Sequence, residues 1–360
     1  MSLRQFTKRR ITDARAYLQR RLHVPLFLRA RRKEDWLRDP QRALASRLLL
    51  SFRAYRLYLP GAASSRSGLP LLVMVHGCQQ DAQVFAEGTR MNQLAERDDF
   101  IVLYPEQSRR ANPFGCWNWF QPAVLLGSGE AASIARIVRR VVKRYRVDST
   151  RVYVTGMSAG GAMACVLANH YGALFAACAV HSGLMYGAAN SPSAAAVAMR
   201  LGSRNPAPKT ALQATQTSPQ SAAFVPAMVV HGDSDRTVNP VNAERISEQV
   251  RMHAENESVP PLRLVETAER RITGPGRAYR VRDYKRDGRI VLRKVVVEGL
   301  DHAWSGGDAR HPFNDPQGPD ASQLIWDFLR EFRRVPGQKS TGRRFSLPAI
   351  WNRLRQIFAN

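Results

Sequence analysis

The stretch that decides the fold is Arg151-Val152-Tyr153-Val154-Thr155-Gly156-Met157-Ser158-Ala159-Gly160, which runs directly into the apolar segment Ala159–His170. Its first five residues have the character of a buried strand, and the spacing in Ala159–His170 predicts a helix. Gly156 and Gly160 flank Ser158, and small neighbours permit the tight turn that exposes a serine hydroxyl at a helix N-terminus. The pattern also occurs by chance in Gly-rich structural turns. The strand before it and the helix after it favour a nucleophilic serine.

Outward from this turn, short apolar runs alternate with helical periodicity, which predicts a parallel sheet wrapped by helices. We expect strands at Pro70–His76, Phe100–Tyr104, Arg151–Thr155, Phe175–His181, Ala227–His231 and Val291–Glu298. We expect helices at about Thr89–Arg97, Ala131–Tyr145, Ala159–His170, Val241–Ala254 and Ser322–Phe332.

Two further segments predict antiparallel pairing at the borders of this sheet. Ser51–Leu59 alternates as an edge strand does, and Tyr279–Tyr284 is expected to pair with the strand that follows the turn dipeptide Asp287-Gly288. The expected architecture is one doubly wound α/β domain at residues 51–335. Residues 187–223, rich in Ala, Ser, Pro, Gln and Thr, are expected to form a loop or lid insertion.

Composition excludes several classes of protein. The chain has 360 residues, 44% of them hydrophobic and 23% charged, so it can bury a core and is no small disulfide scaffold. No run approaches the roughly 18–20 apolar residues of a membrane-spanning helix, and no apolar segment follows the basic N-terminus as in a Sec signal peptide. No Cys and His cluster has zinc spacing and no Gly-rich phosphate loop occurs, so we expect no metal and no nucleotide cofactor.

A nucleophilic serine needs a histidine as general base and an acid that orients the histidine. Asp233 and Asp235 both follow the expected strand Ala227–His231. We choose Asp235 because it lies further into the loop, whereas Asp233 is expected to cap the turn through its own backbone.

Among the eight histidines, His302 lies in a loop after the last expected parallel strand, where open α/β sheets place ligands. His181 and His231 also end expected strands, but they precede the candidate acid in the chain or do not follow the last expected strand. We expect structural roles for His23, His170, His253 and His311. The order Ser158, Asp235, His302 matches the order that the α/β-hydrolase topology imposes.

The oxyanion of a serine-hydrolase intermediate needs preorganised backbone donors. One is expected to be the N–H of Ala159, directly after the nucleophile. The second is expected in the loop His76-Gly77-Cys78-Gln79-Gln80, at Cys78, with a simple turn as the alternative interpretation. Cys78 and Cys116 lie in loops that would meet at this face, which permits a disulfide but does not prove one. Cys165 and Cys178 are expected to pack as small hydrophobic residues.

Six segments together resemble the poly(3-hydroxybutyrate) depolymerase family of serine esterases, and related feruloyl and acetylxylan esterases share much of the pattern. In chain order they are His76-Gly77-Cys78-Gln79-Gln80, Tyr104-Pro105-Glu106-Gln107, Cys116-Trp117-Asn118-Trp119-Phe120, Arg151 to Met163, His231-Gly232-Asp233-Ser234-Asp235 and His302-Ala303-Trp304-Ser305-Gly306-Gly307. The resemblance covers about Ser51 to Phe332.

This resemblance implies an α/β-hydrolase fold with nucleophile Ser158, acid Asp235 and base His302. It also implies a disulfide between Cys78 and Cys116, and substrate contacts near Trp119 and Trp304. The expected substrates are poly(3-hydroxybutyrate) or short hydroxyalkanoate oligomers, with acyl esters of polysaccharides as the alternative. The family is extracellular, but with no signal peptide visible the cytoplasm is the alternative location.

The positive charge is concentrated at the two ends of the chain. The formal net charge is +25, and residues 1–57 hold 16 basic and 4 acidic residues, while residues 330–360 hold 8 basic and 1 acidic residue. We define two basic arms at residues 1–50 and 336–360. The second combines Trp351, Leu354 and Ile357 with arginines, which predicts contact with a polyester granule or an anionic membrane. An inactive hydrolase-fold protein that binds polyanions through its arms is a further alternative, and no motif for specific nucleic-acid binding occurs.

Overall fold

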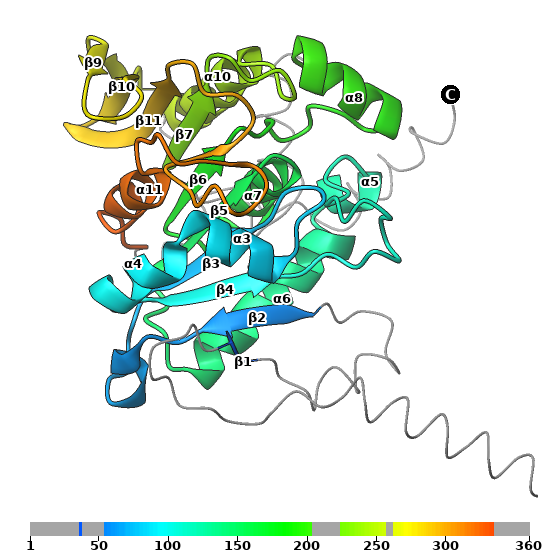
Figure 1. Ribbon diagram of the computed structural model, residues 1–360, viewed down its shortest axis with the longest axis vertical. Helices are drawn as coiled ribbons and strands as arrows, with labels where there is room; N and C mark the ends of the chain where they lie inside the picture. The colour runs from blue at the N-terminus through cyan, green and yellow to red at the C-terminus, as the bar shows by residue number, and fades with distance from the viewer. Residues whose placement is uncertain (1–35, 38–53, 204–223, 257–261, 335–360) are drawn as a thin grey trace, which may run out of the picture.

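A computed structural model describes residues 36–37, 54–203, 224–256 and 262–334 (Figure 1). Its main sheet contains β1 (Trp36–Leu37), β2 (Tyr55–Tyr58), β3 (Leu71–Val75), β4 (Ile101–Pro105), β5 (Val152–Met157), β6 (Ala177–His181), β7 (Ala227–Gly232), β8 (Val265–Glu266), β9 (Arg270–Ile272), β10 (Tyr279–Arg286) and β11 (Arg289–Val297). The strand order is β1-β2-β4-β3-β5-β6-β7-β11-β10-β8, and β9 also pairs with β10. A separate short pair joins β12 (Trp304–Ser305) to β13 (Asn314–Asp315).

The six central strands of this sheet, β4, β3, β5, β6, β7 and β11, run parallel, and the border strands are antiparallel. Strands β3 to β7 are buried along their whole length, as expected when helices cover both faces of a parallel sheet. The β10–β11 hairpin turns at Asp287 and Gly288, whose φ angles of 50° and 76° suit a two-residue turn. The predicted mostly parallel sheet and this hairpin are both confirmed.

Helices cover the two faces of the sheet. They are α3 (Ala82–Thr89), α4 (Met91–Asp98), α5 (Pro122–Leu125), α6 (Gly129–Arg144), α7 (Ala159–His170), α8 (Pro192–Leu201), α10 (Val241–Asn256) and α11 (Ala321–Leu329), with a 3-10 turn η1 (Gly61–Ser64). In Figure 1, α3, α4 and α11 lie in front of the sheet, and their apolar side chains form one core with it. The other core packs α6, α7 and α10 against the opposite face.

Two expectations about the helices need correction. The helix expected at about Thr89–Arg97 is α4, but it starts two residues later, because Arg90 has a left-handed φ of 55° that separates it from α3, a helix that was not expected. Helix α3 starts earlier because Asp81 accepts hydrogen bonds from the backbone N–H groups of Gln83 and Val84. The expected loop at 187–223 contains a helix, α8, and its residues 204–223 lie outside the described part of the chain.

The two basic arms lie almost wholly outside the described residues, so their predicted roles stay predictions. The exception is β1, which pairs antiparallel with β2 and so extends the sheet beyond the expected edge strand. Within the described ranges, no helix is long and apolar enough to cross a membrane.

Candidate active site

Ser158 occupies the turn between β5 and α7. Its φ of 58° and ψ of −122° are strained for a residue with a side chain, and strain of this kind is characteristic of functional turns. The backbone N–H of Ser158 donates to the carbonyl of His181 at 3.0 Å, and its carbonyl accepts from Ala162 at 2.9 Å. The side-chain hydroxyl makes no hydrogen bond to any described residue.

The glycines on either side of Ser158 are required by close backbone approach. A Cβ on Gly160 would lie 2.0 Å from the carbonyl oxygen of Val75, and a Cβ on Gly156 would lie 2.5 Å from the backbone of Gly160. No side chain fits at such distances, so the spacing Gly-x-Ser-x-Gly follows from packing β5 and α7 tightly against β3.

The loops after β7 and β11 bring Asp235 and His302 together. The Nδ1 atom of His302 lies 2.8 Å from Asp235 Oδ2, and the other carboxylate oxygen accepts the backbone N–H groups of Thr237 and Val238. Asp235 is 3% exposed. A carboxylate held by two backbone donors cannot rotate freely, so it fixes both the orientation of the His302 ring and the nitrogen that carries the proton.

A second histidine, His231, lies behind the same carboxylate. Its Nε2 is 3.4 Å from Asp235 Oδ2 and 2.8 Å from the carbonyl of Val238. Burial by itself would raise the pKa of the Asp235 carboxyl, but the rings of His231 and His302 outweigh burial and hold this pKa well below its usual range. Asp235 is therefore ionised wherever the protein is folded near neutral pH.

Asp233 does not cap its own turn as expected. Its Oδ1 accepts the backbone N–H of Gly299, 66 residues later in the chain, at 2.7 Å. The local turn is capped by Asp235 instead. A neighbouring pair has the same cross-loop role, because the Arg236 guanidinium binds Asp301, directly before His302, at 2.7 Å. The two loops that carry the acid and the histidine are thus tied to each other.

The loop after β3 lies against the nucleophile turn. A Cβ on Gly77 would be 3.5 Å from the Cβ of Ser158, and the loop is closed by a bond from the Gly77 N–H to Gln80 Oε1 at 2.9 Å. No described residue accepts a hydrogen bond from the backbone N–H of Cys78 or of Ala159. Both amides are therefore available to a ligand oxygen.

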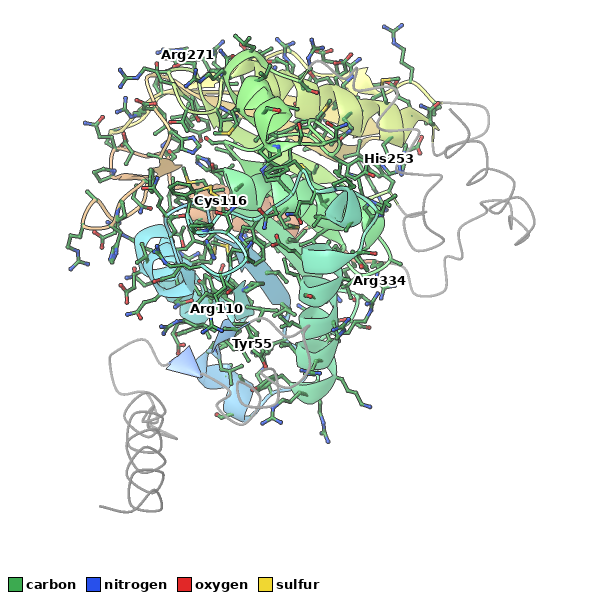
Figure 2. The ribbon with its side chains drawn as sticks, turned by 90° about the vertical axis from the view of Figure 1, so that its right-hand side faces the viewer. Tyr55, Arg110, Cys116, His253, Arg271 and Arg334 are labelled. Atoms are coloured by element: carbon green, nitrogen blue, oxygen red, sulfur yellow. A yellow bond between two sulfur atoms is a disulfide. The ribbon has the colours of Figure 1, made fainter. Side chains whose placement is uncertain are left out.

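Cys78 and Cys116 are joined by a disulfide, as the resemblance implies. The same two loops are also bonded through their backbones, because the N–H of Gln79 donates to the carbonyl of Phe114 at 2.8 Å. In Figure 2, Cys116 lies between Arg271 at one border of the molecule and Tyr55 at the other. The disulfide joins the loop at the carboxyl end of β3 to the loop that follows β4.

The buried carboxylate of Glu130 on α6 holds the loop that carries Cys116 in place. It accepts from the Gln107 side-chain amide at 2.8 Å and from the Asn118 backbone at 2.8 Å. The Gln107 N–H in turn donates to His76 Nε2 at 3.1 Å. That bond places the ring proton of His76 on Nδ1, which donates to the carbonyl of Gly77. The network couples the loops after β3 and β4.

Trp119 and Trp304, implied to lie near substrate, are both buried, at 4% and 1% exposure. The Trp119 ring meets Phe120 edge-on. The Trp304 ring stacks on His181 with centroids 4.9 Å apart, and its Nε1 donates to Ser322 Oγ. Substrate contact at either tryptophan stays a prediction, whereas packing accounts for their positions in this structure.

The sequence interpretation set aside His181 and His231, and the structure places both beside the site. His181 is the last residue of β6 and His231 the last but one of β7. Both therefore lie at the carboxyl ends of parallel strands, as Ser158 does, and this shared position is the pattern that could have identified them. The buried Cys165 and Cys178 have no such placement and pack in the core as expected.

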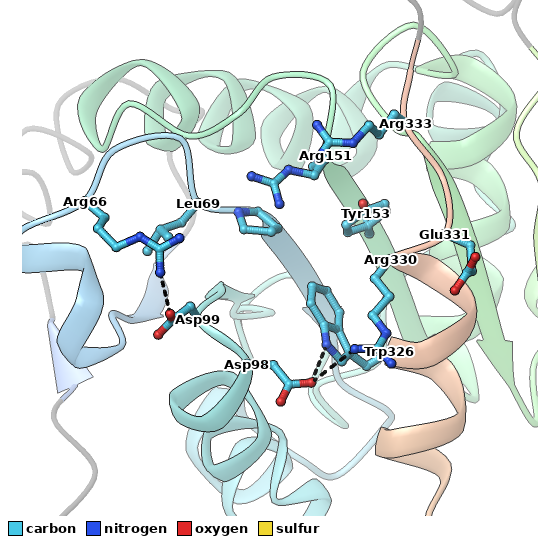
Figure 3. Close-up of a pocket in the computed structure, with 11 residues that line it drawn as sticks. Arg66, Leu69, Asp98, Asp99, Arg151, Tyr153, Trp326, Arg330, Glu331 and Arg333 are labelled. Atoms are coloured by element: carbon cyan, nitrogen blue, oxygen red, sulfur yellow. Dashed lines mark hydrogen bonds and ion pairs between the residues drawn. The ribbon is translucent and has the colours of Figure 1, made fainter.

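A cavity of about 440 Å³ lies at the opposite end of the strands, lined by Arg66, Arg151, Arg330 and Arg333 among others. Figure 3 shows Arg66 turned toward Asp99 and Arg330 toward Asp98. Arg151 and Arg333 both pair with Asp148, so each of the four guanidinium groups has a carboxylate partner. No group of three or more His, Cys, Asp or Glu side chains that could hold a metal ion occurs among the described residues.

The fold is the α/β-hydrolase fold. A solved structure, acetyl xylan esterase from Aspergillus awamori, matches it with a TM-score of 0.59 at 23% sequence identity, over 70% of this chain and 90% of that one. The family model described as Esterase PHB depolymerase matches residues 53–270. The chain therefore belongs to the esterase PHB depolymerase family.

Two curated relatives of this chain have names that refer to different substrates. Poly(3-hydroxyalkanoate) depolymerase C of Paucimonas lemoignei is 36% identical over 182 residues, which are 50% of this chain and 44% of that protein. Acetylxylan esterase A of Aspergillus oryzae is 34% identical over 201 residues, 54% of this chain and 64% of that protein. The chain thus matches less than two thirds of the length of each relative.

Proposed function

We propose that this protein is a serine carboxylesterase with the triad Ser158, His302 and Asp235. The observation that carries the proposal is the 2.8 Å contact of His302 with a buried, ionised Asp235, at the sheet edge where the strained Ser158 lies. Asp235 holds the ring proton on Nδ1, so the Nε2 atom of His302 is the free base.

In the proposed reaction, His302 Nε2 takes the Ser158 proton while Oγ attacks the ester carbonyl. The tetrahedral oxyanion is bound by the N–H groups of Ala159 and Cys78. His302 then returns the proton to the leaving alcohol, and the acyl group stays on Ser158. Water then attacks the acyl-enzyme while His302 takes its proton, and His302 passes this proton to Ser158 Oγ as the C–Oγ bond breaks and the acid is released.

We propose hydroxyalkanoate oligomers or the corresponding polyester as the substrate. Phe114 is 67% exposed on the disulfide loop, and its carbonyl binds the amide that follows Cys78. In the proposed complex this exposed aromatic ring, on the loop bonded to the one that carries Cys78, contacts the aliphatic chain of the polyester. The relative named as a poly(3-hydroxyalkanoate) depolymerase supports the same choice.

The alternative substrate is an acyl ester of a polysaccharide, which the acetylxylan esterase relatives support. A comparison of kcat/KM on a 3-hydroxybutyrate trimer and on an acetylated xylo-oligosaccharide separates the two. A preference for the trimer of at least tenfold is expected, and the reverse preference overturns the polyester choice.

The esterase proposal is tested with p-nitrophenyl acetate, butyrate and octanoate. We expect Ser158→Ala to lower kcat by about 10⁴-fold or more, because loss of a triad nucleophile leaves only binding and oxyanion stabilisation. Ser133→Ala on α6 is the control and should keep the wild-type rate. Equal rates for wild type and Ser158→Ala contradict the triad, and a folded but inert wild type favours polyanion binding by the basic arms.

The C-terminal basic arm is proposed to contact a polyester granule or an anionic membrane. Co-sedimentation of the full chain with granules and with anionic liposomes is expected to fall when residues 336–360 are deleted. Unchanged co-sedimentation removes this part of the proposal.

A further inference from the structure

His181, the last residue of β6, lies at the junction of the two halves of the candidate site. Its side chain is completely buried. Its backbone carbonyl accepts the N–H of Ser158 at 3.0 Å, which is one of the contacts that hold the strained nucleophile turn in place. The backbone of this one residue therefore supports Ser158 directly.

The side chain of His181 reaches the loop that carries His302. Its Nε2 lies 3.3 Å from the backbone N–H of Ser305, which is 124 residues later in the sequence and three residues after His302. Its ring also stacks on Trp304, with centroids 4.9 Å apart and planes inclined by 21°. The imidazole thus contacts two consecutive residues of this loop, through a hydrogen bond and through packing.

These contacts determine the protonation state of the ring. A nitrogen that accepts the Ser305 N–H must carry no proton, so the proton lies on Nδ1, which donates to Ser182 Oγ at 3.2 Å. Burial, with the nearby rings of His231 and His302, lowers the pKa of His181 to about 3. A neutral ring accepts from Ser305 at every pH near neutrality.

We propose that His181 is a positioning residue, which sets the distance between His302 and Ser158 by holding the Ser305 amide on one side and the Ser158 amide on the other. The proposal rests on the proposed esterase function. Because general-base catalysis depends steeply on the gap between hydroxyl and imidazole, a loop displaced by a fraction of an ångström would lower kcat while substrate binding persists.

The experiment compares variants that keep or remove the acceptor. In His181→Gln the side-chain oxygen reaches about as far as Nε2 and can accept the Ser305 N–H. In His181→Leu the volume is similar but no acceptor remains. We expect His181→Leu to lower kcat about 100-fold with KM within about threefold of wild type, and His181→Gln to restore kcat to within about fivefold. His181→Ile, which carries no acceptor and whose β-branched side chain suits a strand, gives the same comparison if the leucine variant does not fold.

The matched control is His170→Gln. His170 is equally buried, at 1% exposure, and its Nε2 binds the carbonyl of Leu125, away from the site. All rates are measured at a temperature where near-ultraviolet circular dichroism shows each variant folded. The control should lose thermal stability without loss of kcat.

Three outcomes overturn the positioning role: wild-type kcat in both apolar variants, equal losses in His181→Gln and the apolar variants, or an equal loss in His170→Gln. The last two show that packing alone matters. Failure of the proposed function is separate, because it is read from Ser158→Ala: if that variant is as active as wild type, the triad is wrong regardless of His181.

Discussion

The carboxyl end and the amino end of the parallel strands are both rich in polar side chains, but they hold them differently. At the carboxyl end, Ser158, Asp235 and His302 are almost fully buried and meet in strained or tightly bonded loops. At the amino end, Arg66 and Arg330 line an open cavity and pair with carboxylates at its surface (Figure 3).

The difference teaches that a cavity does not by itself indicate a site. Charges that neutralise one another in water do little chemistry, since exposed ion pairs are screened and mobile. Buried groups with backbone donors have fixed orientation and perturbed proton affinity, which catalysis requires. The amino end has the cavity, whereas the carboxyl end has the residues of the proposed triad.

The largest expected effect comes from exchanging one carboxylate at each end for an amide. Asp235→Asn should lower kcat for p-nitrophenyl butyrate by about 10³–10⁴-fold, because an asparagine can hold the His302 ring in the wrong tautomer. Asp98→Asn, at a carboxylate that accepts from Trp326 Nε1 at 2.9 Å, should leave kcat within twofold. Comparable losses in the two variants would break the distinction between the ends.

The second effect is on stability and compares two glycines. Gly160→Ala places a Cβ on the backbone of β3 and should lower the free energy of unfolding by about 3 kcal/mol or more. Gly68→Ala, before the amino end of β3, meets no atom within 4 Å and has a φ of 76°, so only backbone strain of about 1 kcal/mol is expected. Urea unfolding measures both, and equal losses contradict the steric argument.

As pH falls, a group at the carboxyl end of the strands should lower the free energy of unfolding at a higher pH than a group at the amino end. The pKa of His181 is about 3 in the folded protein and about 6.5 when unfolded, so the unfolded chain binds more protons between these values and stability falls as pH drops from 6.5 toward 3. Burial by itself would raise the pKa of the Asp148 carboxyl, but hydrogen bonds from Thr150 and Arg151 outweigh burial and hold this pKa at about 2. The stability that ionised Asp148 contributes is therefore lost only as pH falls below about 3.8.

Urea unfolding between pH 7 and pH 4 separates these two groups. His181→Gln should show a shallower loss of stability across this range than wild type, and Asp148→Asn should show the same slope as wild type. A wild-type slope in His181→Gln would contradict the assignment of a neutral, buried ring.

The smallest effect is expected at the rim of the amino-end cavity. Arg66 pairs with Asp99 at 2.7 Å, but the two side chains are 62% and 39% exposed. Arg66→Ala should change the free energy of unfolding by less than about 1 kcal/mol and leave esterase kcat unchanged. A tenfold change in kcat would instead assign this cavity a role in the reaction.

The features predicted from sequence are those whose causes lie within a few residues. The turn at Ser158 follows from Gly156 and Gly160, and the β10–β11 hairpin follows from Asp287-Gly288. The six parallel strands and helices α4, α6, α7, α10 and α11 were likewise predicted from apolar periodicity, whereas α3, α5 and α8 were not. The break at Arg90 was missed, because a left-handed arginine leaves no local pattern.

The sequence by itself determined the α/β architecture, the family and the position of the serine turn, because periodicity, glycine spacing and strand ends are local properties. Only the tertiary structure decided which polar groups meet. Asp233 bonds Gly299, and His181 bonds Ser305, across 66 and 124 residues. Contacts of this kind depend on how the parallel strands bring their carboxyl ends together. The local sequence around either residue therefore does not indicate its partner.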